Sequence, residues 1–159
     1  MQFMNTWKVP GGDQLVYLQQ QPLEVFGRYI QDGTDSKEAG GILLGHVRGE
    51  HLEIIEATEP STMDRRFRYL FERMTFFHHR LAMKRWSDSH GLIRYVGEWH
   101  THPQDYPTPS STDLHEWQIL AADRRDERPL LALIVGCQSL HVEYMHCTGK
   151  RQVLKHGVE

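Results

Sequence analysis

The chain has 159 residues, a length typical of one domain that buries about two-thirds of its unfolded surface. Its 39% apolar and 25% charged residues are ordinary for a globular protein, and a net charge of −3 gives no general attraction to nucleic acid or acidic membranes. The longest apolar run, residues 130–135, is far too short to span a bilayer. We therefore expect a single domain over residues 1–159 with no nucleic-acid or membrane partner.

The N-terminus and the cysteines bear on the compartment. The first residues have no basic region followed by an apolar core, so no signal peptide is predicted. Cys137 and Cys147 are too few for a disulfide framework, and we expect two free, buried thiols in a reducing environment. Together these features predict a cytoplasmic protein.

Hydrophobic periodicity, with glycine and proline as boundaries, predicts the order strand, helix, two strands, helix, strand, helix, two strands. This alternation is typical of a mixed α/β domain, a mixed sheet flanked by helices. Residues 60–71 are expected to be irregular, and the tail after about Thr148 is expected to be flexible. The expected strands are 13–19, 38–47, 51–57, 92–102, 130–136 and 140–146, and the expected helices are 22–32, 74–88 and a segment from 111 to about 125.

Two histidines lie two residues apart on the strand over residues 92–102. His100 and His102 therefore point to the same side of the pleat, and Pro103 ends the strand because it has no N–H for the ladder. Asp113 follows at the start of the next helix and can turn back toward both imidazoles. Two histidines and one carboxylate leave a fourth position for water, which is the arrangement of a catalytic zinc. Because the chain has 11 histidines, the pair alone is also compatible with two half-buried strand residues bonded to their neighbours.

The spacing of Ser110 and Asp113 allows two interpretations. A serine followed three residues later by an acid is typical of a helix N-terminus, where each side chain caps a backbone N–H. The same two residues also lie beside the histidine pair. The two interpretations are compatible, because a capped helix start holds both side chains rigidly.

The full pattern Glu38, then His100-Thr101-His102-Pro103, then Ser110-X-X-Asp113 resembles the JAMM (JAB/MPN) metallopeptidase family. The segment 38–45 also resembles the strand that carries the glutamate of that family, and the likeness covers roughly residues 38–113. The resemblance implies a cytidine-deaminase-like core with one Zn²⁺ on His100, His102 and Asp113. It further implies that Glu38 moves the proton of the attacking water and that Ser110 donates a hydrogen bond to the oxyanion.

The resemblance also implies a substrate class. The short chain is similar to bacterial stand-alone JAB proteins of CBASS-type anti-phage operons, which would make it an isopeptidase that cleaves after the C-terminus of a ubiquitin-like or C-terminally conjugated protein. Its target would then be a conjugated cGAS-like nucleotidyltransferase. A deubiquitinase-like or precursor-trimming peptidase of another bacterial ubiquitin-like pathway is an alternative. A non-catalytic MPN scaffold is disfavoured, because all five motif residues are present. A zinc deaminase is rejected, because the chain lacks the Pro-Cys-X-X-Cys pair.

Three further features carry expectations. Glu98 shares the pleat face of the histidines, and we expect it to orient a histidine or bond the backbone rather than bind metal. Gly40 and Gly41 are expected to let an extended substrate approach the strand. The basic and aromatic segment 64–73 is expected to contact the ubiquitin-like partner.

Overall fold

The structure is a computed structural model that describes residues 3–60, 65–66, 71–72 and 75–157; at 65–66, 71–72 and 75–77 only the backbone is described. The expected partner-contacting segment at 64–73 therefore lies largely outside the described residues. What is described there is a short antiparallel pair, β5 (Arg65–Arg66) with β6 (Phe71–Glu72).

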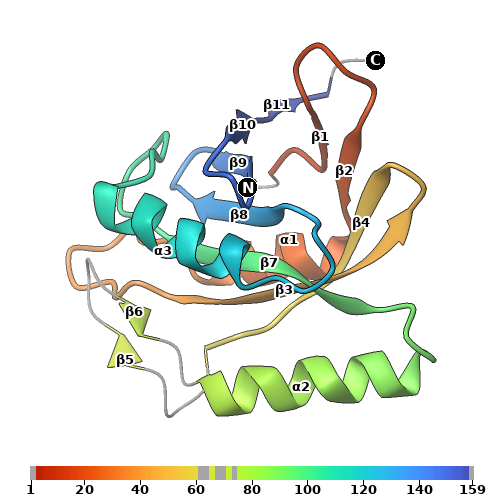
Figure 1. Ribbon diagram of the computed structural model, residues 1–159. Helices are drawn as coiled ribbons and strands as arrows, with labels where there is room; N and C mark the ends of the chain where they lie inside the picture. Colours follow the sequence, from red (N-terminus) through yellow and green to blue (C-terminus); the bar gives the residue numbers. More distant parts are fainter. Residues whose placement is uncertain (1–2, 61–64, 67–70, 73–74, 158–159) are drawn as a thin grey trace.

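A nine-stranded mixed sheet forms the frame of the molecule (Figure 1). Its order is β10-β9-β8-β7-β3-β4-β2-β1-β11. The pairs β2 with β4 and β7 with β8 are parallel, and the other pairs are antiparallel, so the predicted mixed sheet is confirmed. The strands are β1 (Thr6–Lys8), β2 (Leu15–Leu18), β3 (Gly40–Arg48), β4 (His51–Ala57), β7 (Arg94–Thr101), β8 (Leu130–Val135), β9 (Leu140–Met145), β10 (Arg151–Val153) and β11 (Lys155–His156).

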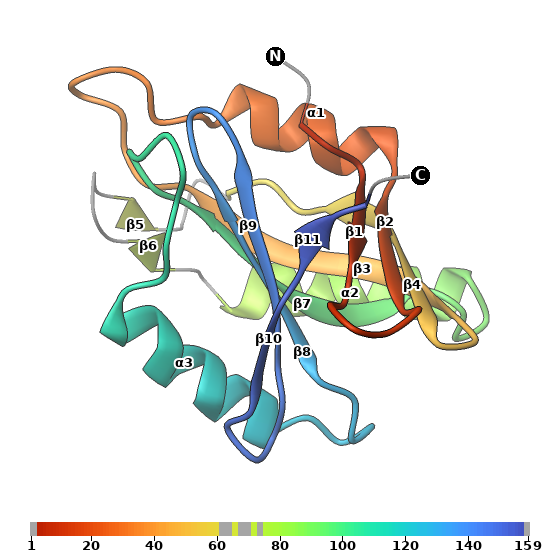
Figure 2. The ribbon, with the colours of Figure 1, turned by 90° about the horizontal axis from the view of Figure 1, so that it is seen from above.

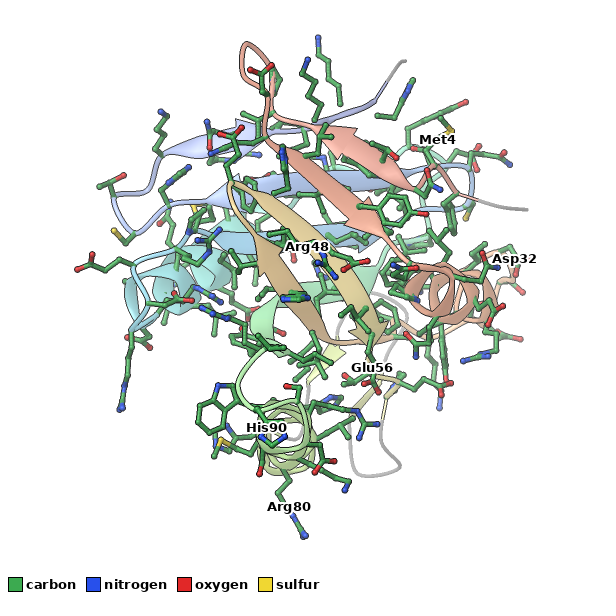
Figure 3. All side chains as sticks on the ribbon, turned by 90° about the vertical axis from the view of Figure 1, so that its right-hand side faces the viewer. Met4, Asp32, Arg48, Glu56, Arg80 and His90 are labelled. Carbon is green, nitrogen blue, oxygen red and sulfur yellow. The ribbon has the colours of Figure 1, made fainter. Side chains whose placement is uncertain are left out.

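Helices lie on both faces of the sheet. Viewed from above, α1 (Gln20–Arg28) lies on one side and α3 (Ser111–Ala122) on the other (Figure 2). Helix α2 (Thr75–Asp88) runs below β3 and β7 (Figure 1). Arg85 joins it to β4 through an ion pair of 2.7 Å with Glu56. Figure 3 shows Glu56 of β4 on the side of the sheet where α2 lies. No helix among the described residues is long and apolar enough to cross a membrane.

The strand β8 explains why helices cover both faces. All six of its residues are buried, because alternate side chains enter two different cores. Leu131 and Leu133 join the large core beneath α1, whereas Leu130 and Ile134 join a smaller core beneath α3. The run of six apolar residues therefore marks the central, doubly covered part of the sheet.

The C-terminal tail differs from the prediction. Instead of a flexible end, residues 151–153 pair with β9 and residues 155–156 pair with β1. Only the buried Leu154 separates these two edge strands, so the sheet curls around its core until its edges meet (Figure 2). The tail is ordered because Arg151 makes two hydrogen bonds to the buried carboxylate of Glu143.

Two smaller expectations are also corrected. Both cysteines are free, but Cys137 is half-buried and Cys147 is exposed. At Gly41, the space that a side chain would occupy is filled by the protein itself, since an added Cβ would lie 2.4 Å from the carbonyl oxygen of Thr58. The missing side chain of Gly41 therefore serves packing against Thr58, and the approach of a substrate at Gly40 stays a prediction.

Candidate metal centre and active site

The end of β7 places the histidine pair. His100 and His102 project from the same face, with their Nε2 atoms 3.1 Å apart, as the alternation of the strand predicts. Thr101 between them points to the opposite face and is fully buried. Its hydroxyl accepts a hydrogen bond from the N–H of Ala39 and donates one to Gln31 Oε1. Thr101 therefore fixes β7, the strand that carries the histidine pair, to the segment that carries Glu38.

The start of α3 places the carboxylate. Ser110 Oγ accepts a hydrogen bond from the N–H of Asp113 at 3.1 Å, and the N–H of Ser110 donates to Asp113 Oδ2 at 2.9 Å. This capping box confirms the helix-start interpretation. It also aims the carboxylate back at β7, so that Oδ1 lies 3.3 Å from His100 Nε2 and Oδ2 lies 3.2 Å from His102 Nε2.

These distances fit a tetrahedral metal ion. Donor atoms about 2.0 Å from a zinc ion lie roughly 3.3 Å from one another in tetrahedral geometry. The two histidine nitrogens are 3.1 Å apart, and each lies near that spacing from a different oxygen of Asp113, His100 3.3 Å from Oδ1 and His102 3.2 Å from Oδ2, so the carboxylate spans both imidazoles. The nitrogen and oxygen donors are also those that zinc prefers in catalytic sites. His100, His102 and Asp113 therefore fit the ion that the sequence pattern implies.

The electrostatics of the ligand set favour a cation. Burial raises the pKa of Asp113, but hydrogen bonds from His100 and His102 outweigh it and hold that pKa well below its usual range. Burial likewise lowers the pKa of His102, whereas its contacts with Asp113 and Gln104 raise it, with a net increase. The carboxylate therefore stays charged, and its charge favours a cation at this place.

Glu38 is the fourth member of the group. It is 7% exposed, and one of its carboxylate oxygens lies within 4.8 Å of ligand atoms of His100 and His102. Burial is the main cause that raises the pKa of Glu38 to about 8, and the nearby Asp113 and Glu116 add to it, whereas His102 opposes it. A carboxyl group with this pKa can both accept and release a proton near neutral pH.

A cleft of about 880 Å³ opens over the site. Its wall combines the motif residues with part of α3, including Trp117, Ile119 and Leu120. Ser110, exposed at the helix start, lines it together with Glu38 and the histidines. The cleft is large enough for an extended peptide segment beside the metal ligands.

Glu98 also lines the cleft, and its carboxylate accepts a hydrogen bond of 2.6 Å from the hydroxyl of Tyr95. This bond joins Glu98 to a residue of the same strand, and the expected role of Glu98 in orienting a histidine or bonding the backbone stays a prediction.

Sequence reasoning missed two residues that support the site. Gln104 Oε1 lies 3.2 Å from His102 Nδ1 and accepts a hydrogen bond from the N–H of Thr108. This contact places a proton on Nδ1 and leaves Nε2 free to bind metal. Glu116 lines the cleft one turn after Asp113. The position of Gln104, two residues after a ligand and just past Pro103, is the signal that could have found it.

Comparison with known proteins decides the family. The family of prokaryotic homologues of the JAB domain matches residues 24–148. The chain belongs to this family. The match includes all five motif residues, from Glu38 to Asp113, and most of the sheet.

Several curated JAB relatives carry the same name, CD-NTase/cGAS isopeptidase. The one from Pseudomonas aeruginosa is 48% identical over 153 residues, which are 96% of this chain and 97% of that protein. The one from Escherichia coli is 39% identical over 72% of this chain and 71% of that protein, and the one from Vibrio cholerae is 38% identical over 62% of each. A Desulfitobacterium hafniense protein solved in solution shares the fold, with a TM-score of 0.58 over 89% of both chains at 20% identity.

Proposed function

We propose that this JAB domain is a zinc-dependent isopeptidase that cleaves after the C-terminus of a conjugated protein. Its substrate would be a cGAS-like nucleotidyltransferase joined through its C-terminus to another protein, and cleavage would reverse that conjugation in bacterial anti-phage defence, in the cytoplasm. The observation that supports the chemistry best is the convergence of His100, His102 and Asp113, with contacts of 3.1–3.3 Å, beside the buried Glu38.

The roles of the residues follow from their positions. His100, His102 and Asp113 would hold one Zn²⁺, which supplies a Lewis acid and lowers the pKa of water at the site. Glu38 would take the proton of the attacking water and pass it to the leaving amine. Its buried carboxyl group, whose pKa is raised to about 8, suits both steps. Gln104 and the helix cap would keep His102 and Asp113 in place during these steps.

Ser110 would act on the carbonyl oxygen of the scissile bond. Its Oγ accepts the N–H of Asp113, so its own hydrogen remains available for another acceptor. A hydroxyl fixed at a helix start and facing the cleft suits the oxygen of a tetrahedral intermediate. One such donor contributes roughly 10²–10³ to kcat in other hydrolases.

The relatives support the choice of substrate. Their shared name describes an isopeptidase that acts on a CD-NTase, and the nearest in identity among those described matches almost the whole of this chain. A peptidase of another ubiquitin-like pathway would use the same metal site but a different conjugate. The substrate and the chemistry are therefore tested separately.

The test uses two purified fusions with the parent protein. One carries the C-terminal segment of a CD-NTase joined to a lysine side chain of a carrier, and the other carries a ubiquitin-like C-terminus joined in the same way. We expect cleavage of the first after its terminal residue, seen as one mass change, and loss of cleavage with a chelator that zinc restores. Cleavage of only the ubiquitin-like fusion would contradict the CD-NTase assignment but not the metallopeptidase.

A matched pair of variants tests the role of Glu38. Glu38→Gln should keep stoichiometric zinc and lose cleavage by at least about 10²-fold, because the replacement cannot accept a proton. Glu24→Gln, at an exposed position on α1, should cleave at the parental rate. A Glu38→Gln protein that cleaves normally would remove this residue from the mechanism.

A further inference from the structure

A second cavity lies at the opposite end of α3 from the metal centre. It has a volume of about 200 Å³ and lies where the β1–β2 and β3–β4 turns approach the start of β8 and the end of β9. Gln14 and Glu50 line it from the two turns, and Arg124 and Arg128 line it from the segment that follows α3.

The polar lining of this cavity is rich in hydrogen-bond donors. Two guanidinium groups, a phenol hydroxyl, an imidazole and two side-chain amides face a single carboxylate, that of Glu50, among the described lining residues. The residues that carry these groups are Gln14, Arg124, Arg128, Tyr144, His146 and Gln152, of which His146 and Gln152 bond each other through Nε2 and Oε1 at 2.6 Å.

Arg124 carries an unused donor in the wall of this cavity, beneath its accessible surface. Its side chain is 6% exposed, and its Nε and Nη2 atoms bond the carbonyl oxygens of Arg128 and Tyr95 and the carboxylate of Asp126. Its Nη1 is buried and has no hydrogen-bond partner in the described part of the chain. A buried guanidinium N–H without a partner is costly, and native structures usually supply an acceptor for it.

Two neighbouring residues, Arg128 and Tyr144, offer further hydrogen-bond donors. The side chain of Arg128 has no hydrogen bond or ion pair within the described residues. The hydroxyl of Tyr144, whose side chain is 7% exposed, lies within the electrostatic reach of both arginines. Arg124, Arg128 and Tyr144 thus line the same small cavity, and their side chains offer donors without a negative charge.

We propose that this cavity binds a small oxyanion, with a phosphate group as the ligand. A phosphate presents several acceptors to a guanidinium fork and a hydroxyl at once, which matches Arg124, Arg128 and Tyr144. A water molecule takes about 30 Å³, so the cavity has room for one such group with some water but not for a folded segment. The group would come from inorganic phosphate or from a nucleotide, whose base would extend outside.

Calorimetric titration of the parent protein tests the site. Sodium phosphate and adenosine monophosphate are titrated separately at constant ionic strength, with sodium chloride as the blank. We expect saturable binding of one phosphate group per chain. Equal affinity for both ligands would indicate that the phosphate alone is bound, and tighter binding of the nucleotide would indicate contacts with its nucleoside.

Four variants test whether the residues of this cavity bind the phosphate. Arg128→Ala should weaken binding about tenfold or more, and Tyr144→Phe should weaken it about threefold, since each removes one donor. Glu50→Gln should strengthen binding about threefold, because the opposing carboxylate is lost. Arg125→Ala, one residue from Arg124 but outside the cavity and exposed, should bind like the parent.

Three outcomes would overturn the site. The first is heat that does not saturate, and the second is an Arg128→Ala protein, folded by circular dichroism, that binds phosphate like the parent. The third is phosphate binding that a chelator abolishes in the parent and in the Arg128→Ala protein alike, which would place the anion at the metal centre instead. If Arg128→Ala misfolds, the other two variants test the site, because Tyr144→Phe should weaken phosphate binding and Glu50→Gln should strengthen it. Unchanged affinity in both would overturn the site.

Discussion

Arg151 on β10 binds Glu143 on β9 through two hydrogen bonds, of 2.8 and 2.7 Å, and the glutamate side chain is fully buried. His141 Nε2 also lies 2.8 Å from the same carboxylate. A buried charge that keeps most of its partners is tolerated, but one that loses its main partner is strongly destabilising.

We therefore expect Arg151→Ala to lower the free energy of unfolding by about 3 kcal/mol. Arg151→Lys keeps the charge but not the paired geometry and should cost less. Lys150→Ala, at the exposed neighbouring position, should change stability by less than about 0.5 kcal/mol. Urea unfolding followed by circular dichroism measures all three. Equal stability of Arg151→Ala and Lys150→Ala would show that the pair does not hold β10.

The pH dependence of the metal-free protein should report on Glu38. Burial raises the pKa of this carboxyl from 4.5 to about 8, so between those values the folded state binds more protons than the unfolded state. Its contribution therefore destabilises the fold progressively as the pH rises from about 4.5 to 8. Glu38→Gln should remove that trend and stabilise the chelated protein at pH 8 by roughly 2–4 kcal/mol. Parallel stability curves for parent and variant between pH 5 and 8 would contradict this.

Loss of the ligand carboxylate should separate metal binding from folding. Asp113→Ala removes the acceptor that both imidazoles contact, so we expect zinc content to fall from one per chain to a small fraction. Zinc binding to the parent should also release protons below the raised pKa of His102, and the release should grow as the pH falls. Elemental analysis and titration in buffers of different ionisation enthalpy give both quantities. Asp105→Ala, which is exposed, is the control.

Ser110→Ala should affect catalysis far more than metal binding. We expect kcat to fall by about 10²-fold with unchanged zinc content, because the hydroxyl would serve the oxyanion rather than the ion. Loss of the cap should also cost about 1 kcal/mol of stability. Ser111→Ala, at the next exposed position, should do neither. A Ser110→Ala enzyme with parental kcat would restrict this serine to the helix cap.

Two glycine replacements should change stability in opposite directions. An added Cβ at Gly97 would lie 1.9 Å from the carbonyl oxygen of Leu131 on the paired strand, so Gly97→Ala should cost about 3 kcal/mol or more. At Gly27 on α1 an added Cβ meets nothing within 4 Å, and Gly27→Ala should stabilise the protein by about 0.5–1 kcal/mol. Thermal melts distinguish the two, and similar melting temperatures would show that the close approach at Gly97 relaxes without cost.

The parts of the fold that the sequence predicts are those with a local, repeating signal. The alternation around His100 predicts the shared face of the histidine pair, and the spacing from Ser110 to Asp113 predicts the helix start. Both patterns depend on neighbours within a few residues. The roles of Glu38, Ser110 and the metal ligands in a reaction remain predictions, because geometry alone does not test them.

The parts that sequence reasoning missed depend on distant contacts. His78 is buried against the hydroxyl of Thr58 at 2.8 Å, a contact between α2 and the end of β4 that no periodicity indicates. The strands at the tail are two and three residues long and mostly polar, and β10 is held by a glutamate eight positions before Arg151. Thr101 was placed between two ligands, but its bond to Gln31 spans 70 positions.

The closure of the sheet at Leu154 has a consequence for handling the protein. One short segment fastens two separate borders, since β10 covers β9 and β11 covers β1. Proteolysis or truncation shortly before it would uncover two rows of unpaired backbone groups in a single event. Uncovered strand borders act as templates for intermolecular pairing, so the shortened molecule would tend to self-associate even with its metal ligands intact.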